Sequence, residues 1–479
     1  MTTMSLTALP TELLDEIILR SLPESFENLA LTCKGIYELC TPFIEHHNTL
    51  RAEFQNFNYS GRATHPSPNA LKTAWDLIVR IAIEPDVARY IQELDLMIDG
   101  HPYRGGLSGM LPHATDPNCG EAVSKLLASS RHLQQVGVDW EEFYAEVEED
   151  LEERRYSQSA SAFLLTLLPN VKTLKLPRLW KMNNLTHRLL GSIIRDAKQS
   201  RLYGTSLSQV TRVESYKSLY GNDKLHLDQV VPFLALPRVR SFYGPSIVAM
   251  GDAPMTFPLE ESYRSYGANL EVVRLKSSCM DHTTIADFLK HTPRLKTLRY
   301  SHSTKGDPRD WDICKFITAI EREAGNQLEE LCVSIFELRG SILPGKASMC
   351  NFRRLRKLEF PLEIAMCNIA SSMPTDPIPE HTELLMSELV PPSVSELSLI
   401  SEGKNGHEKA VEAMFRHFAS KKDLHFPALR TIHLTCPDYP STDEVYKEQC
   451  EKLVVETQKA GVDLDLLPSL AFRAMDFSE

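Results

Sequence analysis

The sequence has no long apolar run and no concentration of basic residues. Its longest apolar stretch, AFLLTLL at 162–168, is far shorter than the roughly 20 residues that cross a bilayer. The opening MTTMSLTALP lacks the basic and apolar regions of a secretory signal. The net charge of −12 argues against broad nucleic-acid binding, which needs a basic surface. We therefore expect a cytoplasmic and/or nuclear protein without a nucleic-acid or membrane partner.

The common catalytic and metal-binding motifs are also missing. There is no P-loop, HExxH helix, GxSxG elbow or kinase signature, and the ten cysteines form no CxxC pair. Cys279, Asp281 and His282 resemble parts of a thiol-nucleophile site, but polar residues are ordinary in the loop after a strand. His46 and His47 could supply only half of a metal site, and exposed histidines at a helix end explain them equally well. We expect no catalysis, no cofactor and no metal.

One hexad, apolar-x-x-apolar-x-apolar, recurs along the chain. The clear copies are IQELDL (91–96), LQQVGV (133–138), VKTLKL (171–176), LEVVRL (270–275), LKTLRY (295–300), LEELCV (328–333), LRKLEF (355–360), VSELSL (394–399) and LRTIHL (429–434). Two weaker copies are VTRVES (210–215) and VRSFYG (239–244). The last three residues of each copy alternate apolar, polar, apolar, which predicts a short strand with one buried face.

A helical pattern ending in a breaker precedes most of the hexads, as in TTIADFLKHTPR before LKTL. Repeated helix–strand units of this kind bury together a face that no unit buries alone, as leucine-rich repeats do. The middle apolar positions are 25 to 42 residues apart, whereas regular repeats run about 20 to 29 residues. We therefore predict an α/β fold: an irregular leucine-rich-repeat solenoid with a curved parallel sheet and helices on its convex side. An α/β domain with a flat parallel sheet is the alternative.

Several segments interrupt the repeats. The Gly/Pro-rich segment 101–120 and the proline-punctuated segment 370–381 are predicted loops, and the GGxxG of the first lacks the context of a phosphate-binding motif. The segment 141–155 is strongly acidic, which indicates a solvated helix or insert or, alternatively, an acidic docking patch.

The N-terminal segment is apolar on more than one side. Leu9 and Pro10 start a predicted helix that Leu22 and Pro23 end, and a second helical run follows. So short a segment cannot bury all of its apolar surface alone, which predicts a partner. The pattern LPTELLDEII…LP, followed by LALTCK at 29–34, resembles the F-box. Ile36, beside Tyr37, stands where that family often has tryptophan.

The resemblance implies a function. F-box proteins with leucine-rich repeats look like substrate receptors of SCF-type ubiquitin ligases, in which the F-box docks on a Skp-type adaptor that leads to a cullin and a RING subunit. The repeats then hold the protein to be ubiquitinated. The implied domains are the F-box (1–50), a helical linker (51–88), the repeat solenoid (89–470) and a C-terminal tail (471–479). The adaptor-binding residues that follow from this match are Leu9, Pro10, Leu13, Ile17, Leu22, Leu29, Cys33, Ile36 and Tyr37.

Polar positions beside the inward-facing leucines predict a substrate surface. They are Lys175, Arg212, Tyr216, Tyr243, Arg274, Lys276 and Arg299. Basic and tyrosine residues on one face of an acidic protein suggest selection of an acidic or phosphorylated segment. Solvated strand residues without a shared partner are the alternative. Other functions remain open at this point: a scaffold that binds the adaptor without a cullin, a receptor gated by a small molecule, or an enzyme.

Overall fold

The computed structural model describes residues 6, 9–59, 71–99, 117–153, 155–199, 204–215, 224–251, 263–372, 385–403, 406–436 and 443–468. The chain divides into two compact units. Unit 1 comprises residues 1–214 and 236–238, and unit 2 comprises residues 215–235 and 239–479. Within the described ranges, no helix combines the length and the apolar character needed to cross a bilayer. The predicted tail 471–479 lies outside the described residues, as do 101–116 and 373–381 of the predicted loops.

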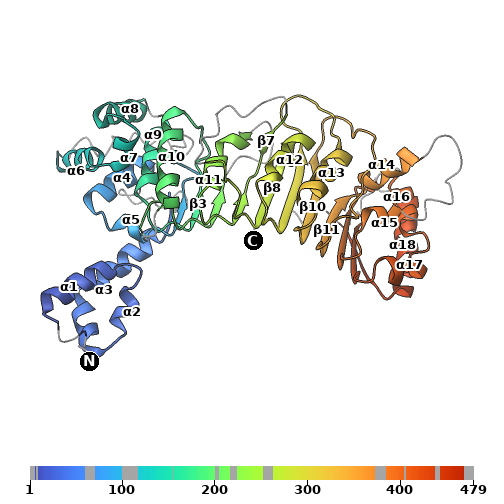
Figure 1. Cartoon of the computed structure of the whole chain (residues 1–479), viewed down its shortest axis with the longest axis horizontal. Helices are drawn as coiled ribbons and strands as arrows, with labels where there is room; N and C mark the ends of the chain where they lie inside the picture. Colours follow the sequence, from blue (N-terminus) through green and yellow to red (C-terminus); the bar gives the residue numbers. More distant parts are fainter. Residues whose placement is uncertain are drawn as a thin grey trace. The chain divides into compact units, whose positions relative to one another are not determined.

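Unit 1 begins with three helices and continues into a parallel sheet with further helices (Figure 1). Its elements are α1 (Thr11–Ser21), α2 (Phe26–Ala30), α3 (Lys34–Phe54), β1 (Asn56–Asn58), α4 (Ala74–Ile83), α5 (Val87–Tyr90), β2 (Glu93–Asp95), α6 (Pro117–Ala128), α7 (Arg131–Gln135), α8 (Trp140–Glu152), α9 (Gln158–Leu164), a 3-10 turn (Leu165–Leu167), β3 (Thr173–Lys175), α10 (Asn184–Gln199) and β4 (Arg212–Glu214). The strands lie in the order β1-β2-β3-β4. We call α1, α2 and α3 the helical trio.

Unit 2 alternates strands with helices. Its elements are β5 (Leu225–His226), a 3-10 turn (Leu227–Gln229), α11 (Val231–Leu234), β6 (Ser241–Tyr243), β7 (Ile247–Ala249), β8 (Val272–Met280), α12 (His282–Lys290), β9 (Thr297–Ser303), α13 (Ile313–Ala324), β10 (Glu330–Glu337), β11 (Lys357–Pro361), α14 (Glu363–Ser372), α15 (Leu385–Leu389), β12 (Glu396–Ile400), α16 (His407–Phe415), α17 (Phe418–His425), β13 (Thr431–Thr435), α18 (Glu444–Lys459) and β14 (Asp463–Leu467). The strand order is β6-β8-β9-β10-β11-β12-β13-β14, and β7 pairs with β5 and β8.

The middle apolar residues of the hexads line up across neighbouring parallel strands. In unit 1 the aligned residues are Phe57, Leu94, Leu174 and Val213. In unit 2 they are Phe242, Val273, Leu298, Leu331, Leu358, Leu397, Ile432 and Leu464. All except Leu464 are at most 5% exposed. Because strand side chains alternate between faces, this register keeps one face of each sheet apolar.

The next residue of each strand in unit 2 forms a second row, which we call the polar row. Its members are Tyr243, Arg274, Arg299, Cys332, Glu359, Ser398, His433 and Asp465. Helices α12 and α13 lie side by side along the unit-2 sheet (Figure 1). Asp281 and Asp312 cap these two helices by accepting hydrogen bonds from backbone N–H groups of the first turn. The mixed α/β architecture with parallel strands is confirmed.

The strand prediction is confirmed for every hexad except LQQVGV (133–138). There, Ser130 accepts a hydrogen bond from the Leu133 N–H and starts helix α7, and Gly137 follows with φ +61°. Leu94 of β2 pairs directly with Leu174 of β3, so the sheet holds no position for an intervening strand. The hexad at 133–138 was therefore a wrong prediction.

Strands β1 and β14, at the ends of the two sheets, lie outside the predicted hexads, as do the short strands β5 and β7. β1 falls within the segment 51–88 that we interpreted as a helical linker, and it pairs with β2. Helix α3 runs to Phe54, past the predicted F-box boundary at residue 50, so the helical trio leads directly into the sheet. At the other end, β14 pairs with β13 and follows the same alternation in the sequence DLDLL.

Candidate functional site

The helical trio has a small core of its own. Its buried residues are Leu14, Ile18, Leu22, Phe26, Ala30, Ile36 and Cys40, with Leu9, Leu29, Leu39, Phe43 and Ile44 packed against them. Seven apolar residues buried among three short helices are enough to fix their mutual packing, although a core of this size is marginal alone. The trio therefore depends on contacts with its surroundings for stability.

Two of the predicted adaptor-binding residues belong to this core. Leu22 is 4% exposed and Ile36 is 1% exposed, so neither side chain can contact a partner while the trio is folded. Ile36 lies on the inner side of α3 and occupies the core beside Cys40. The expectation that Leu22 and Ile36 form part of the docking surface is therefore wrong. Both residues shape that surface indirectly by holding α1 and α3 together.

The remaining predicted residues are accessible to different degrees. Leu13 is 52% exposed and Tyr37 is 47% exposed, and both Pro10 and Cys33 are exposed. Leu9, Ile17 and Leu29 are half-buried. On α1, Pro10, Leu13 and Ile17 share one side because they are three and four residues apart.

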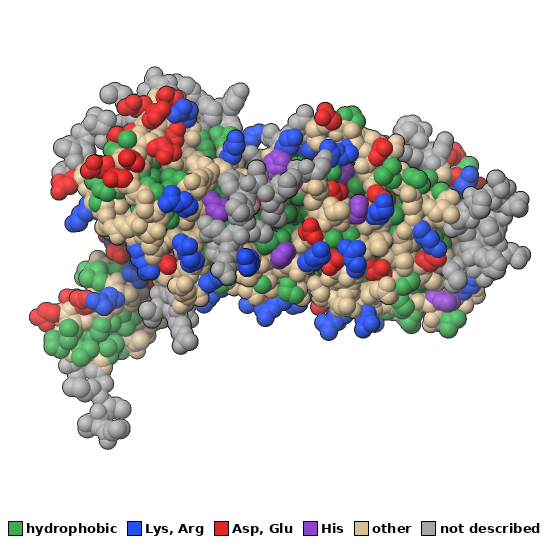
Figure 2. All heavy atoms as spheres, turned by 45° about the horizontal axis from the view of Figure 1, so that its top comes forward, with side chains coloured by type: hydrophobic (Ala, Val, Ile, Leu, Met, Phe, Trp, Pro, Cys, Tyr) green, Lys and Arg blue, Asp and Glu red, His purple; other side chains and the backbone are tan. Residues whose placement is uncertain are grey.

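Leu31 and Leu19 are further exposed apolar residues of the trio, at 79% and 48%. Leu31 was part of the motif match but was not assigned to the docking surface. In Figure 2, hydrophobic side chains gather on the trio, at the lower left of the view. A patch of exposed apolar side chains on a small helical unit is typical of a protein-binding surface. Leu19 lies apart from Leu13, because a separation of six residues places the two on different sides of α1.

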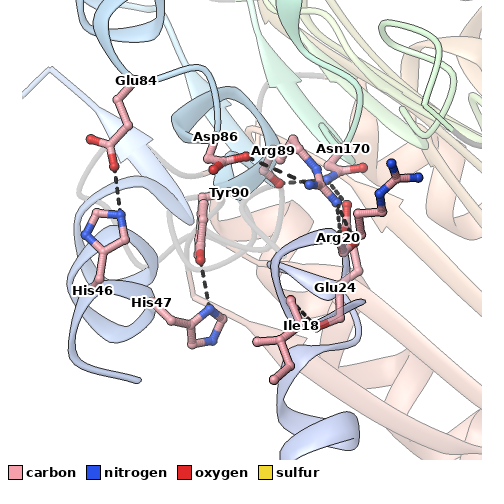
Figure 3. A network of polar contacts seen from close by, with 11 residues as sticks. Ile18, Arg20, Glu24, His46, His47, Glu84, Asp86, Arg89, Tyr90 and Asn170 are labelled. Atoms are coloured by element: carbon pink, nitrogen blue, oxygen red, sulfur yellow. Dashed lines mark hydrogen bonds and ion pairs between the residues drawn. The ribbon is translucent and has the colours of Figure 1, made fainter. Parts of the chain in front are cut away.

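Polar contacts join the trio to the rest of unit 1 (Figure 3). Arg89 donates a hydrogen bond to the Glu24 carboxylate over 3.0 Å. Asn170 donates to the Arg89 carbonyl over 2.7 Å and also to Glu24. Glu24 lies just before α2, Arg89 in α5 and Asn170 just before β3, so this network ties the trio to the start of the sheet.

A second set of contacts involves the two histidines of α3. His46 Nε2 lies 2.8 Å from a carboxylate oxygen of Glu84, and His47 Nδ1 lies 2.9 Å from the Tyr90 hydroxyl (Figure 3). His47 is only 2% exposed and its ring lies against that of Phe26, with centroids 4.7 Å apart. The sequence interpretation of both residues as exposed helix-end histidines is therefore wrong for His47, which is a buried residue of the joint between α3 and α5.

The predicted substrate residues fall into two groups. Tyr243, Arg274 and Arg299 are neighbours in the polar row of unit 2, and Lys276 lies two residues beyond Arg274 on β8. Lys175 and Arg212 belong to unit 1, on β3 and β4. Tyr216 lies outside the described residues.

Several of these basic residues already form ion pairs with carboxylates of the chain. Lys175 Nζ lies 3.2 Å from Asp95, Arg212 lies 2.5 Å from Glu214, and Arg299 lies 2.6 Å from Glu330. An anionic ligand at these positions would have to displace a carboxylate, so the geometry gives an anionic segment little advantage there. Tyr243 and Arg274 are half-buried residues of the same row and pair directly across β6 and β8.

Cys332, a further member of the polar row, is buried. It is 6% exposed, and its thiol lies 3.1 Å from a carboxylate oxygen of Glu359. Burial, reinforced by the negative charge of Glu359, raises the pKa of the Cys332 thiol well above its usual value. The thiol therefore stays protonated and unreactive.

The described residues give no support to a thiol nucleophile at Cys279 or to a metal site. The Asp281 carboxylate accepts hydrogen bonds from the N–H groups of Gly251, Thr283 and Thr284, and so serves as a helix cap beside Cys279. In the described part of the chain, no group of three His, Cys, Asp or Glu residues is placed to hold a metal ion.

The acidic segment 141–155 forms most of helix α8. Phe143 and Val147 are buried, and acidic side chains gather on its outer side (Figure 2). The helix part of that interpretation is confirmed, and α8 is an amphipathic helix with a solvated acidic side.

No protein-family model matches this sequence, and no curated protein shows significant similarity to it. The resemblance to the F-box therefore rests on the sequence between Leu9 and Tyr37.

Proposed function

We propose that this chain is the substrate-recognition subunit of an SCF-type ubiquitin ligase. In this proposal the helical trio is an F-box that docks a Skp-type adaptor, and the strand–helix units are leucine-rich-repeat-like units that bind the protein to be ubiquitinated. The chain itself performs no catalysis, because the adaptor leads to a cullin and a RING subunit that carry out the transfer.

The observation that carries the proposal is that some apolar residues of the trio fill its core whereas others are exposed. Leu14, Ile18 and Ile36 satisfy its own core, while Leu13 and Tyr37 remain exposed. Fully burying a side chain such as Leu13 stabilises a complex by roughly 1.5–3 kcal/mol. A structural role within this chain does not account for these exposed residues, whereas adaptor docking does.

The joint between the trio and the sheet supports the same function. A receptor must present its bound substrate at a defined position relative to the adaptor, which requires that the trio does not swing freely. The buried His47–Tyr90 contact and the Glu24–Arg89–Asn170 network meet that requirement within unit 1. Their exchange for a flexible linker would leave adaptor binding intact and impair ubiquitin transfer.

The polar row supports a substrate surface on unit 2. Tyrosine and arginine, the types found at Tyr243 and Arg274, are enriched at binding hot spots. Tyr243 offers a ring for packing and Arg274 offers hydrogen-bond donors at directly paired positions, so we propose these two residues as the centre of the substrate surface.

Affinity purification from cells, followed by identification of the co-purifying proteins, tests the function. The wild-type chain is compared with Leu13→Asp and with Leu19→Asp, a matched exposed leucine on another side of α1. We expect a Skp-type adaptor, a cullin and a RING subunit with the wild type and with Leu19→Asp, and none of the three with Leu13→Asp. Adaptor without cullin in the wild-type sample would instead indicate a scaffold outside the ligase. Absence of the adaptor would contradict the proposal.

A further inference from the structure

A cavity of about 210 Å³ lies in unit 2, where β8 and β9 end and α12 and α13 begin. Ligands of α/β proteins commonly bind at the carboxyl ends of parallel strands. Met250, Met280 and Leu343 contribute apolar side chains to the lining. His302 and Trp311 also line the cavity, and their rings stack with centroids 3.9 Å apart and planes 7° apart.

Hydrogen bonds fix the proton on one nitrogen of His302. The Tyr300 hydroxyl donates to the Ser278 carbonyl over 3.1 Å and accepts from the Met280 N–H over 3.0 Å. All three contacts of the hydroxyl are satisfied at once when His302 Nδ1, 2.9 Å away, carries the proton and donates to it, and we assign this tautomer. Burial lowers the pKa of His302 to about 3, so the ring is neutral at physiological pH. The other nitrogen, Nε2, therefore has a free lone pair.

Both stacked rings have a polar atom with no hydrogen-bond partner among the described residues. His302 is 3% exposed, and its Nε2 accepts no hydrogen bond within the described ranges. Trp311 is 4% exposed, and in the same described part of unit 2 its Nε1–H group has no acceptor. Buried polar groups are normally paired, so the unmatched Trp311 donor, on the ring stacked against His302, indicates a missing ligand.

We propose that this cavity is a binding site for a phenol, that is, a neutral aromatic ring carrying one hydroxyl group. A hydroxyl can donate to His302 Nε2 and accept from Trp311 Nε1–H, which no purely apolar ligand and no simple acceptor can do. A cavity of about 150 Å³ accommodates benzene, so the observed volume is sufficient for a substituted ring. The thioethers of Met250 and Met280 suit an aromatic neighbour.

The carboxylates of Asp281 and Asp312 at the cavity do not favour a cation instead. Asp281 accepts hydrogen bonds from three backbone N–H groups, and Asp312 caps α13 and pairs with Lys315 over 3.0 Å. These carboxylates are already compensated, so a neutral ligand fits the site. The proposal does not depend on the ubiquitin-ligase role, and either can fail without the other.

Binding of p-cresol and of toluene to the full chain, measured by ligand-detected NMR titration, tests the site. The two ligands share the ring and the methyl group and differ in the hydroxyl. We expect p-cresol to bind roughly tenfold more tightly than toluene, which corresponds to about 1.4 kcal/mol. Equal affinities, or no binding of p-cresol, would overturn the proposal without any variant being needed.

His302→Phe keeps a ring against Trp311 but removes the acceptor, so p-cresol should bind this variant no more tightly than toluene. His407→Phe is the matched control, because His407 is also 3% exposed but hydrogen-bonds to Ser401 and does not line the cavity. It should bind p-cresol as the wild type does. An undiminished preference for p-cresol in His302→Phe would refute the assignment. N-acetyl-L-tyrosinamide distinguishes two sources of the phenol group, a tyrosine residue of a protein and a free phenol. Affinity at least equal to that of p-cresol indicates the tyrosine residue, and weaker affinity indicates the free phenol.

Discussion

His47 and Tyr90 meet in a buried contact in which the imidazole Nδ1 lies 2.9 Å from the phenolic hydroxyl. His47 belongs to the third helix of the trio and Tyr90 to the helix just before β2, so this pair joins the helical trio to the sheet of unit 1. Burial lowers the pKa of His47 and raises that of Tyr90 to about 12, so both groups are neutral near pH 7.

Tyr90→Phe should loosen this joint. It leaves His47 Nδ1 buried without a partner, and an unsatisfied buried polar group costs about 1–3 kcal/mol. Amide hydrogen exchange in α5 and in the second half of α3 should accelerate. Tyr37→Phe, at an exposed tyrosine of the same helix, is the control and should leave exchange unchanged. Equal effects of the two variants would show that the joint does not rest on this contact.

The same contact should weaken in acid. Because the pKa of His47 is lower in the folded chain than in the unfolded chain, protonation favours unfolding, and the stabilisation present above about pH 6.5 is lost as the pH falls. Hydrogen exchange in α5 should therefore accelerate from pH 7 to pH 5 after correction for the intrinsic exchange rate. This acceleration should be smaller in Tyr90→Phe, where the contact is already lost.

Asp99 should give unit 1 a pH dependence of the opposite sense. Its carboxylate is 3% exposed and accepts hydrogen bonds from the Ala74 N–H over 2.9 Å and the Ser161 hydroxyl over 2.5 Å. Burial outweighs these bonds and raises its pKa from 3.8 to about 7. Between these values the folded chain holds a proton that the unfolded chain has released, so this contribution to the free energy of unfolding falls as the pH rises.

Asp99→Asn keeps the shape of the side chain and removes its titratable carboxyl group. Relative to the wild type, it should therefore become more stable on going from pH 5 to pH 8, as measured by urea unfolding. Glu53→Gln, at an exposed residue of α3, should show no such change relative to the wild type. A constant difference between Asp99→Asn and the wild type at both pH values would mean that Asp99 titrates normally.

Leu298 and Leu331 should be essential to the sheet of unit 2. They are paired neighbours in the aligned apolar row and are at most 1% exposed. Replacing either by Ala should reduce the free energy of unfolding by about 2–5 kcal/mol, because a cavity remains. Lys357→Ala is the control on the next strand; its exposed pair with Glu396 should contribute less than about 1 kcal/mol. Comparable losses in urea unfolding for Leu298→Ala and Lys357→Ala would contradict the assigned register.

Tyr243→Ala and Arg274→Ala test the substrate surface. Each should reduce the recovery of the proteins that bind unit 2 while leaving the co-purified adaptor unchanged, because the trio is untouched. Lys357→Ala, on the same sheet and two residues before Glu359 of the polar row, is the control and should have no effect on either. Retention of every such partner in both variants would place the substrate surface elsewhere.

The repeated hexad predicted the strands well because a short strand buried on one face leaves a period-two pattern that does not depend on distant residues. The hexad failed at 133–138, because the same apolar spacing is also compatible with helix α7, whose N-terminus Ser130 caps. It did not find β1, whose NFN offers a single apolar residue, and the pairing of Phe57 with Leu94 that stabilises it is a tertiary contact.

The docking residues were only partly predictable. A motif match cannot separate Ile36, which fills the core of the trio, from its exposed neighbour Tyr37, because the two differ only in their position around α3. The burial of His47 depends on Tyr90, which is 43 residues away along the chain. Cys279, Asp281 and His282, which the sequence singled out, do line the cavity of unit 2, but the rest of its lining comes from the ends of other strands and from the loop before α13 and left no signal in the sequence.

Direct binding of the purified chain to a purified Skp-type adaptor tests the central claim most directly. Isothermal titration should show a one-to-one complex for the wild type and for Leu19→Asp. Leu13→Asp should weaken binding by at least about tenfold, since it places a charge where an apolar contact worth roughly 1.5–3 kcal/mol is expected. Because Leu13 is half exposed, the fold of this variant should match the wild type by circular dichroism. No binding by the wild type, or equal binding by Leu13→Asp and Leu19→Asp, would contradict the account.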